Sequence, residues 1–380
     1  DLRMSRGLGD VYKRQPINEA MKHSNILLLL LCGMLPLLAG AQRRADRQTL
    51  SDDRSFSMIL LGDPQGYVKY AVNQPILELC TAWIADNIDN LHIRAVLCTG
   101  DLVEQNENAV PDSRMLDRTS REMWQASSRA FERLDDRVPY IVSCGNHDYG
   151  YKRAENGITN FPDYFPIERN SAWRGCCVAT FPNRNRRASL ENAAFEFSDP
   201  AWGKLLVVTT EFHPRDEVLG WAAKLIGGKT YAGHRVIYMT HGYLTNGKEA
   251  RHIAEDRYDI APGNAGAEIW HKLVKPSSNI GLVICGHTAN GNGEFADNVS
   301  YRIDRNDAGK KVHQMMFNVQ TLGGGWEGNG GDGWLRILEF LPDGKTIRVR
   351  TYSPLFGISP STKHLAHRTE PFDRFDIVLE

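Results

Sequence analysis

The sequence predicts an α/β fold in a single domain, with two packed mixed β-sheets flanked by helices. Five apolar runs end in glycine or polar residues, as strands buried on both faces do; they lie within "SMILLGDPQ", "RAVLCTGDLVE", "VPYIVSCGNHD", "HRVIYMTHG" and "NIGLVICGHT". Segments 73–88, 117–136 and 214–228 have helical spacing of apolar residues and separate several of these runs. This alternation of strand and helix predicts an α/β sheet.

The last third of the chain has a different pattern. "KKVHQMMFNVQTL", "GWLRILEFLPDGKTIRVRTYS" and "FDRFDIVLE" predict antiparallel strands, and "LPDGKT" predicts a hairpin turn. The glycine-rich stretch 323–334 has no repeat period and is expected to be a flexible surface loop. Because no linker is long enough to divide residues 42–380, we expect them to form one domain.

Composition places the chain among ordinary globular proteins. It has 380 residues, 42% of them hydrophobic and 24% charged, with a formal net charge of -1. The only short basic cluster, residues 183–189, is typical of a solvated loop. We therefore expect no nucleic-acid-binding surface.

The N-terminal segment predicts export. Residues 21–41 have a basic Lys22, an apolar run and the small residues Ala39 and Ala41, which is the pattern of a signal peptide. The mature chain is then expected to begin near Gln42, to be secreted or periplasmic in a bacterium, and to have no transmembrane segment after cleavage. Residues 1–20 are interpreted as an artefact of the gene model.

The cysteines suggest mostly structural roles. Cys98, Cys144 and Cys285 close apolar runs, where cysteine usually acts as a small buried hydrophobic residue. Cys176 and Cys177 lie in a loop-like stretch and are the better candidates for a redox-active pair. No C-x-x-C zinc pattern is present.

Polar side chains follow each of the five predicted strands. In open α/β sheets, functional sites lie beyond the carboxyl ends of the strands. Taken singly, an Asp, Asn or His in such a place is usually a turn former or a capped loop residue. Five strand ends that all supply metal-binding side chains instead predict one metal site; the residues concerned are Asp63, Gln65, Asp101, Asn146, His147, His241 and His287.

These motifs resemble those of the calcineurin-like metallophosphoesterase superfamily. The matching blocks are "GDPQ", "GDLVE", "GNHD", "THG" and "GHTA", which occur between residues 62 and 289 in the order of that family. The C-terminal strands also resemble those of exported bacterial members. The resemblance implies an αββα sandwich that binds two divalent metal ions (Mn, Fe or Zn) and takes a phosphate ester as substrate.

The resemblance also implies a role for each metal-binding residue. Asp101 would bridge both metals, and Asn146, His241 and His287 would complete one site with it. Asp63 and Gln65 would join Asp101 in the other site. Two such cations neutralise phosphoryl oxygens and lower the pKa of a water between them, which then acts as the hydroxide nucleophile.

Two further residues are implied in catalysis rather than in metal binding. His147 would contact the phosphoryl group and protonate the leaving alkoxide as a general acid. Glu104 matches the position of an acid that orients this imidazole in the family.

Two departures from the family pattern fall on the same metal site. The family commonly has His where this chain has Gln65, and a second His where it has Ala289. Loss of imidazole ligands favours a harder, oxygen-rich site. We therefore expect an asymmetric pair with one tight and one labile metal, in which Asn290 or a water fills the place of the missing His.

The leading hypothesis is an exported metal-dependent phosphoesterase that hydrolyses phosphate mono- or diesters. One alternative is a non-catalytic protein of the same fold that binds phosphate or a phosphorylated glycan through an incomplete first site. Another is a metallohydrolase acting on a different bond, such as an amide. The presence of His147 and Glu104 favours an enzyme, because a binding protein has no use for a proton donor.

Weaker candidates for the cleft have equally plausible structural roles. Glu211 could reach the cleft or be a buried capping acid. The evenly spaced Gln314, Asn318 and Gln320 could line the site or face solvent, and Trp326 could stack on a substrate ring or anchor its loop.

Overall fold

The computed structural model describes residues 48–111 and 116–380. The chain divides into two units, Asp1–Arg47 and Gln48–Glu380, and the second of these carries every element described below. The predicted signal peptide, the proposed gene-model artefact and the expected start near Gln42 all lie outside the described residues. Among the described helices, none combines the length and the apolar character needed to cross a membrane.

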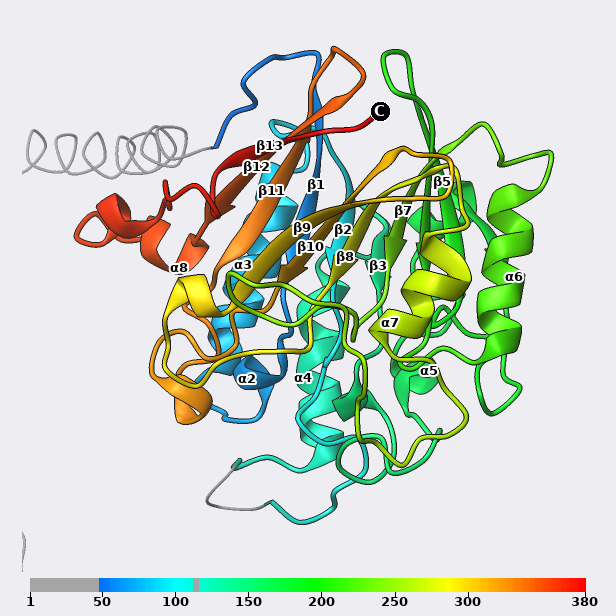
Figure 1. The fold of residues 1–380 in the computed structure, drawn as a ribbon. Helices are drawn as coiled ribbons and strands as arrows, with labels where there is room; N and C mark the ends of the chain where they lie inside the picture. The colour runs from blue at the N-terminus through cyan, green and yellow to red at the C-terminus, as the bar shows by residue number, and fades with distance from the viewer. Residues whose placement is uncertain (1–47, 112–115) are drawn as a thin grey trace, which may run out of the picture. The chain divides into compact units, whose positions relative to one another are not determined.

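The first sheet has six strands in the order β13-β12-β11-β1-β2-β3 (Figure 1). Strands β1, β2 and β3 are parallel, whereas β11, β12 and β13 extend the sheet beyond β1 in antiparallel fashion. The bounds are β1 Phe56–Leu61, β2 Ile93–Cys98, β3 Tyr140–Val142, β11 Leu335–Phe340, β12 Thr346–Tyr352 and β13 Phe375–Val378. The predicted hairpin at "LPDGKT" joins β11 to β12.

The second sheet has seven strands in the order β4-β5-β6-β7-β8-β10-β9. Strands β6, β7, β8 and β10 are parallel, and antiparallel strands extend the sheet on both sides. The bounds are β4 Cys177–Thr180, β5 Ala193–Asp199, β6 Gly203–Thr209, β7 Arg235–Met239, β8 Ile280–Cys285, β9 Val299–Arg305 and β10 Lys311–Phe317. The expectation that the first C-terminal strand is only antiparallel is wrong, because β10 runs parallel to β8 and antiparallel to β9.

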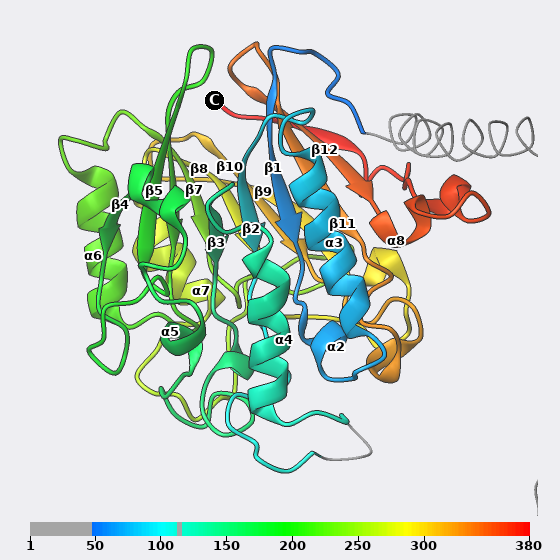
Figure 2. The same cartoon turned by 180° about the vertical axis from the view of Figure 1, so that it is seen from behind.

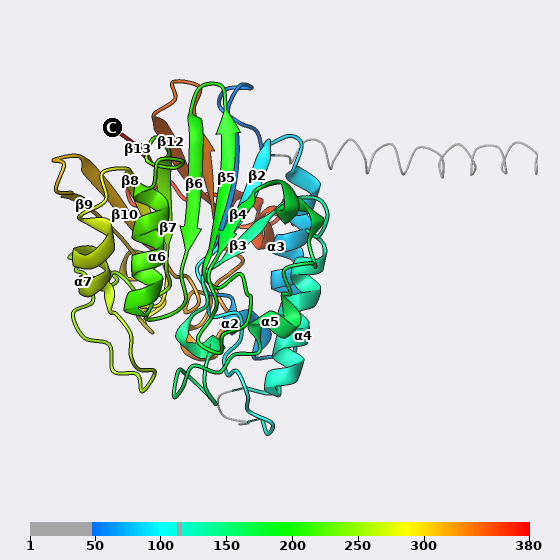
Figure 3. The same cartoon turned by 90° about the vertical axis from the view of Figure 1, so that its right-hand side faces the viewer.

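Helices cover the outer faces of the two packed sheets, which confirms the predicted two-sheet α/β sandwich in a single domain (Figures 2 and 3). Helices α3 and α4 lie on the first sheet, and α6 and α7 lie on the second. Their bounds are α3 Gln74–Asn87, α4 Ser120–Glu132, α6 Asp216–Gly227 and α7 Gly266–Ile269; the short helices are α2 Gln65–Val68, α5 Phe161–Tyr164 and α8 Pro354–Gly357.

The apolar runs are continuous because both faces of the inner strands are buried. In β7, Ile237 and Met239 belong to the main core, whereas Val236 and Tyr238 point to a second cluster shared with α6. Side chains alternate between the two faces of a strand, so a strand covered on both faces needs an apolar residue at every position. The parallel strands β1, β2, β3, β7 and β8 then bring their following loops to the same end of the sandwich.

Candidate metal centre

The loops after five parallel strands bring together seven of the eight side chains that the sequence singled out. The first sheet supplies Asp63 and Gln65 after β1, Asp101 after β2, and Asn146 and His147 after β3. The second sheet supplies His241 after β7 and His287 after β8. The site therefore lies where the two sheets meet.

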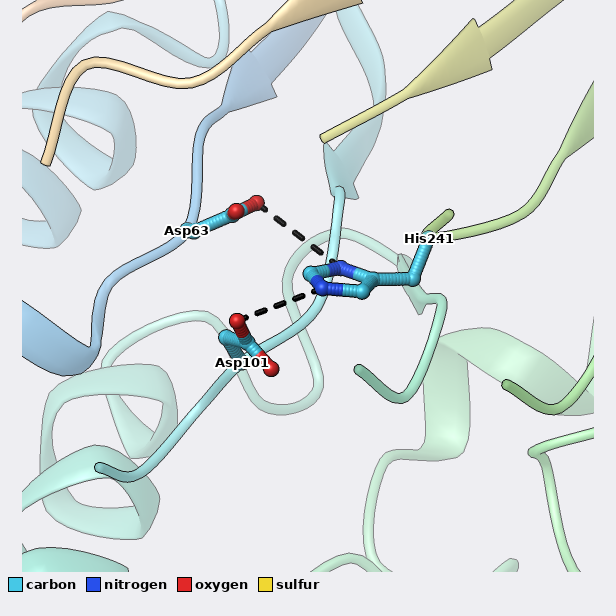
Figure 4. Close-up of side chains that lie close together, drawn as sticks. All are labelled: Asp63, Asp101 and His241. Atoms are coloured by element: carbon cyan, nitrogen blue, oxygen red, sulfur yellow. Dashed lines mark ion pairs between the residues drawn. The ribbon is translucent and has the colours of Figure 1, made fainter. Parts of the chain in front are cut away.

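The centre of the cluster is a buried Asp-Asp-His group (Figure 4). One potential ligand atom each from Asp63, Asp101 and His241 lies within 4.8 Å of the others. His241 Nε2 is 3.2 Å from Asp101 Oδ2, and His241 Nδ1 is 3.9 Å from Asp63 Oδ1. Two carboxylates and one imidazole, all buried, form a group that could bind a metal ion.

The electrostatics of this group favour a positive charge between the carboxylates. Burial alone would lower the pKa of His241, but the charges of Asp101 and Asp63 outweigh it and raise that pKa to about 10. Burial acts in the opposite direction on a carboxyl group, and it raises the pKa of Asp63 above its usual value. A proton on His241 and a divalent cation are therefore alternative ways to compensate the same buried negative charge.

Asn146 and His287 point at the same place as His241. Asn146 Oδ1 lies 3.1 Å from His241 Nε2 and 2.9 Å from His287 Nδ1. Because His241 Nδ1 is 2.8 Å from the carbonyl oxygen of Thr99, it is the nitrogen that donates, which leaves Nε2 with the lone pair in the neutral ring. Nε2 then faces oxygen acceptors on Asn146 and Asp101, an arrangement that suits a cation.

The side-chain oxygen of Gln65 gives a second, independent indication that the site suits a cation. Its Nε2 donates to Asp101 Oδ2 at 2.9 Å, whereas its Oε1 is buried and has no hydrogen-bond partner among the described residues. A buried amide oxygen without a partner costs free energy. The donor set and this unpartnered oxygen both fit a divalent metal ion.

Two glycines leave room for the carboxylates. A Cβ at Gly145 would collide with Asp101 Oδ1, and a Cβ at Gly286 would collide with Asp63 Oδ1. Each glycine comes immediately before a candidate ligand, Asn146 and His287 respectively. The "GNHD" and "GHT" motifs therefore need glycine because backbone and carboxylate approach closely there.

Two candidate ligands have left-handed backbone conformations, with φ values of 50° for Asp101 and 77° for His287. Such conformations cost roughly 1–3 kcal/mol each outside glycine and cluster at functional sites. Hydrogen bonds hold both in place: Asp101 Oδ1 accepts from the backbone of His147 at 2.9 Å, and Asp63 Oδ2 accepts from the backbone of His287 at 2.8 Å.

His147 is held by Glu104, but not in the way that the sequence suggested. His147 Nδ1 donates to the backbone carbonyl of Glu104 at 2.6 Å. The Glu104 carboxylate instead lies 3.5 Å from Lys69 Nζ in a largely buried ion pair. The expectation that the carboxylate orients the imidazole therefore needs correction, because the main chain makes this contact and leaves His147 Nε2 available to a substrate.

Sequence reasoning missed two acids that organise the site. Asp148, the last residue of "GNHD", is fully buried and accepts from the backbone amides of Leu102 and Gly145, at 2.8 Å in each case, so it ties the Asp101 loop to the Asn146 loop. Its place in the motif could have indicated this role. Asp256 lies 3.0 Å from His287 Nε2, and nothing in its local sequence distinguishes it from other loop acids.

The weaker candidates have structural roles. Glu211 is buried and paired with Arg215 at 2.7 Å, and Gln314 is buried against Tyr243, whose hydroxyl donates to it at 2.7 Å. Asn318 Nδ2 donates to the carbonyl oxygen of His287 at 3.1 Å, so it helps to hold the backbone of that candidate ligand. The side chain of Asn290, proposed to replace the missing His, caps its own turn by accepting from the Asn292 backbone amide.

Two further expectations concern Trp326 and the paired cysteines. Trp326 is 48% exposed, in the glycine-rich loop. That loop packs on α2 and is not a free surface loop, since Gly333 donates to the Tyr67 hydroxyl at 3.0 Å.

Burial raises the pKa of Cys176 to about 12, which disfavours the reactive thiolate that a redox pair requires. All six described cysteines are free, and Cys98, Cys144 and Cys285 are buried as expected.

Comparisons with known proteins give relatives without a stated activity. No family model matches the chain. The chain is 27% identical over 304 residues to the uncharacterized protein YvnB of Bacillus subtilis (strain 168); the match covers 79% of this chain. The chain spans about a fifth, 20%, of the length of that relative. Among solved structures, GAP50, the anchor in the inner membrane complex of Plasmodium, is similar with a TM-score of 0.45 and 12% identity, over 86% of this chain and 89% of that one.

Proposed function

We propose that the protein is an exported, metal-dependent phosphoesterase of the calcineurin-like kind, acting on phosphate mono- or diesters. The observation that carries the proposal is the convergence of Asp63, Asp101 and His241 from two sheets, with Asn146 and His287 directed at the same place. Divalent metals in such a site neutralise phosphoryl oxygens and acidify the attacking water. In this proposal Asp101 contributes to both metal positions, and Gln65 only to the weaker one.

The protein side chains divide the remaining work. Asp63, Asp101 and Asn146 would hold the metal ions through side-chain oxygen atoms. His241 and His287 would hold them through ring nitrogen atoms. His147 acts as the general acid, because its Nδ1 is fixed by the Glu104 carbonyl and its Nε2 remains free to give a proton to the leaving oxygen. A protein that only bound phosphate would gain nothing from this orientation of His147, which favours the enzyme over the binding alternative.

The test uses purified residues 42–380 before and after removal of metal by a chelator. We expect hydrolysis of 4-nitrophenyl phosphate or bis(4-nitrophenyl) phosphate that is lost with the metal and restored by Mn²⁺, Zn²⁺ or Fe²⁺. Metal binding with phosphate affinity but without turnover on either ester would favour the binding alternative. Turnover that survives complete metal removal would contradict the proposal.

A further inference from the structure

Asp256 makes a contact that the proposed metal and acid roles do not use. It lies in the long connection between β7 and α7, and its side chain is 15% exposed. Its Oδ2 is 3.0 Å from His287 Nε2 and 3.3 Å from His213 Nε2. One carboxylate oxygen therefore sits between two imidazoles, one of which is a candidate metal ligand.

The contact decides which nitrogen His287 offers to the site. His287 Nδ1 faces the cluster, 2.9 Å from Asn146 Oδ1, so this nitrogen must keep its lone pair to bind a cation. A neutral imidazole has one N–H, so Nε2 must then carry the hydrogen and needs an acceptor. Asp256 Oδ2 is that acceptor.

The other two imidazoles of the site also donate a hydrogen bond from one ring nitrogen, but to backbone carbonyl oxygens, which are weaker acceptors than a carboxylate. His241 Nδ1 donates to the Thr99 carbonyl at 2.8 Å, and His147 Nδ1 donates to the Glu104 carbonyl at 2.6 Å. Among the three, only His287 has a carboxylate oxygen within hydrogen-bond distance of its outer nitrogen. A carboxylate behind a metal-binding histidine fixes the tautomer and raises the basicity of the ligand.

The connection that carries Asp256 also makes packing contacts that do not involve the Asp256 carboxylate. Tyr258 packs edge-on against Phe212 with ring centroids 5.2 Å apart, and Phe212 stacks on His213 at 4.1 Å. This aromatic group holds the segment in place. The contact of Asp256 with His287 is therefore not needed to anchor the segment.

We propose that Asp256 is a positioning residue that holds His287 in the tautomer and orientation that bind metal. This inference rests on the proposed function, because His287 is a ligand only if the site binds metal. It predicts that loss of the Asp256 carboxylate weakens one metal position and spares the fold.

The experiment compares Asp256→Asn and Asp256→Ala with two controls in residues 42–380. Asp259→Asn removes the same charge from an exposed position of the same connection. His213→Phe keeps an aromatic ring beside Phe212 but removes the second partner of Asp256. Each metal-free protein is titrated with Mn²⁺ and with Zn²⁺, metal stoichiometry is measured, and Tm is recorded without metal.

The Asp256 variants should lose affinity at one of two metal positions by about 10- to 100-fold. Asp256→Asn should lose less than Asp256→Ala, since the amide oxygen still accepts from His287. Asp259→Asn should bind as the unmodified protein does, and His213→Phe should lose less than Asp256→Asn. The metal-free Tm of Asp256→Asn should stay close to that of the unmodified protein.

Two results would overturn the inference in distinguishable ways. If the unmodified protein binds metal and Asp256→Ala binds it within twofold as tightly, or if His213→Phe weakens binding as much as Asp256→Ala does, Asp256 does not position His287. If the unmodified protein binds no metal at all, the proposed function fails together with the inference.

Discussion

Asp101 contacts three other residues of the candidate centre and uses both of its carboxylate oxygens to do so. Oδ1 accepts from the His147 backbone, while Oδ2 accepts from Gln65 and lies 3.2 Å from His241 Nε2. Asp101→Asn should therefore lower the affinity of both metal positions, whereas Gln65→Ala should affect only the weaker one. Asn is the better replacement than Ala because it tolerates the left-handed backbone at Asp101.

Metal counts after gel filtration test this pair of variants. We expect less than one bound metal per chain for Asp101→Asn and close to one for Gln65→Ala. Equal losses in the two variants would rule out an asymmetric pair.

The role of His147 can be separated from metal binding by the choice of leaving group. His147→Asn should keep the metals and slow hydrolysis of alkyl phosphates by about 10²–10⁴-fold, the usual contribution of a positioned proton donor. Nitrophenyl phosphates should be slowed much less, because nitrophenolate leaves without a proton. Steady-state rates on both ester types, with metal content measured in parallel, give the comparison.

Glu104→Gln is the matched control for this experiment. It keeps the backbone carbonyl that holds His147 and changes only the partner of Lys69. The ratio of alkyl to nitrophenyl rates should therefore stay close to that of the unmodified protein. A shift of that ratio as large as in His147→Asn would mean that the carboxylate, not the carbonyl, controls the imidazole.

At the scale of elements, the glycine-rich loop supports the helix that begins with Gln65. A Cβ at Gly66 would lie 2.7 Å from the Cα of Gly330, so Gly66→Ala must push the loop from α2. We expect a lower free energy of unfolding and weaker binding at the metal position to which Gln65 contributes. Urea unfolding of the metal-free protein and Mn²⁺ titration measure the two effects.

Gly220 provides the control for Gly66. It lies within α6, and a Cβ there would meet no heavy atom within 4 Å. Gly220→Ala should raise the free energy of unfolding by about 0.5–1 kcal/mol, since alanine loses less backbone entropy in a helix. If both variants change stability in the same direction, close packing at Gly66 is not what distinguishes them.

The elements that the sequence predicted best are those with a strong local signal. The strands before Asp63, Asp101 and His287 are buried on both faces, so each is a continuous apolar run that ends at its functional residue. Strands β4 and β9 lie at the edges of the second sheet and are partly exposed, so their apolar signal is weaker. Strand β6 is not among the five apolar runs that predict the site, although its buried run Leu205–Thr209 is as clear as that of β7.

The site was predictable only where a side chain follows its strand directly. Asp63, Asp101 and His241 each come within three residues of the end of a strand, so topology alone brings them together. Asp256 reaches His287 because a long connection folds back over the sheet edge, which no local pattern encodes. The Glu104 contact was assigned to the wrong group because sequence spacing places a residue but does not say whether its side chain or its backbone makes the bond.

At the scale of the whole molecule, the candidate centre joins the two sheets. Asp63 and Asp101 follow strands of the first sheet, and His241 follows a strand of the second. Without metal, a protonated His241 makes the attraction between them, and a bound cation would replace that proton. Metal binding should thus stabilise the whole domain and not only its loops, because a ligand that binds only the folded state adds to the free energy of unfolding.

The pH dependence of this stabilisation has a definite sign. The charges of Asp101 and Asp63 outweigh the effect of burial and raise the pKa of His241 from 6.5 to about 10. A pKa raised by folding contributes stability that is complete below pH 6.5 and is lost as the pH rises through 10. The Tm of the metal-free protein should therefore fall as the pH rises across this window.

A metal must displace the His241 proton, so the affinity for metal should rise by about tenfold per pH unit over the same window. The increase in Tm caused by Mn²⁺ should accordingly be larger at pH 9 than at pH 7, as scanning calorimetry with and without a chelator can measure. Calorimetric titrations in buffers of different ionisation enthalpy should find about one proton released per metal at pH 8, and His241→Gln should abolish that release. A metal-induced shift of Tm that is independent of pH between 7 and 9, or proton release that persists in His241→Gln, would show that another group balances the two carboxylates.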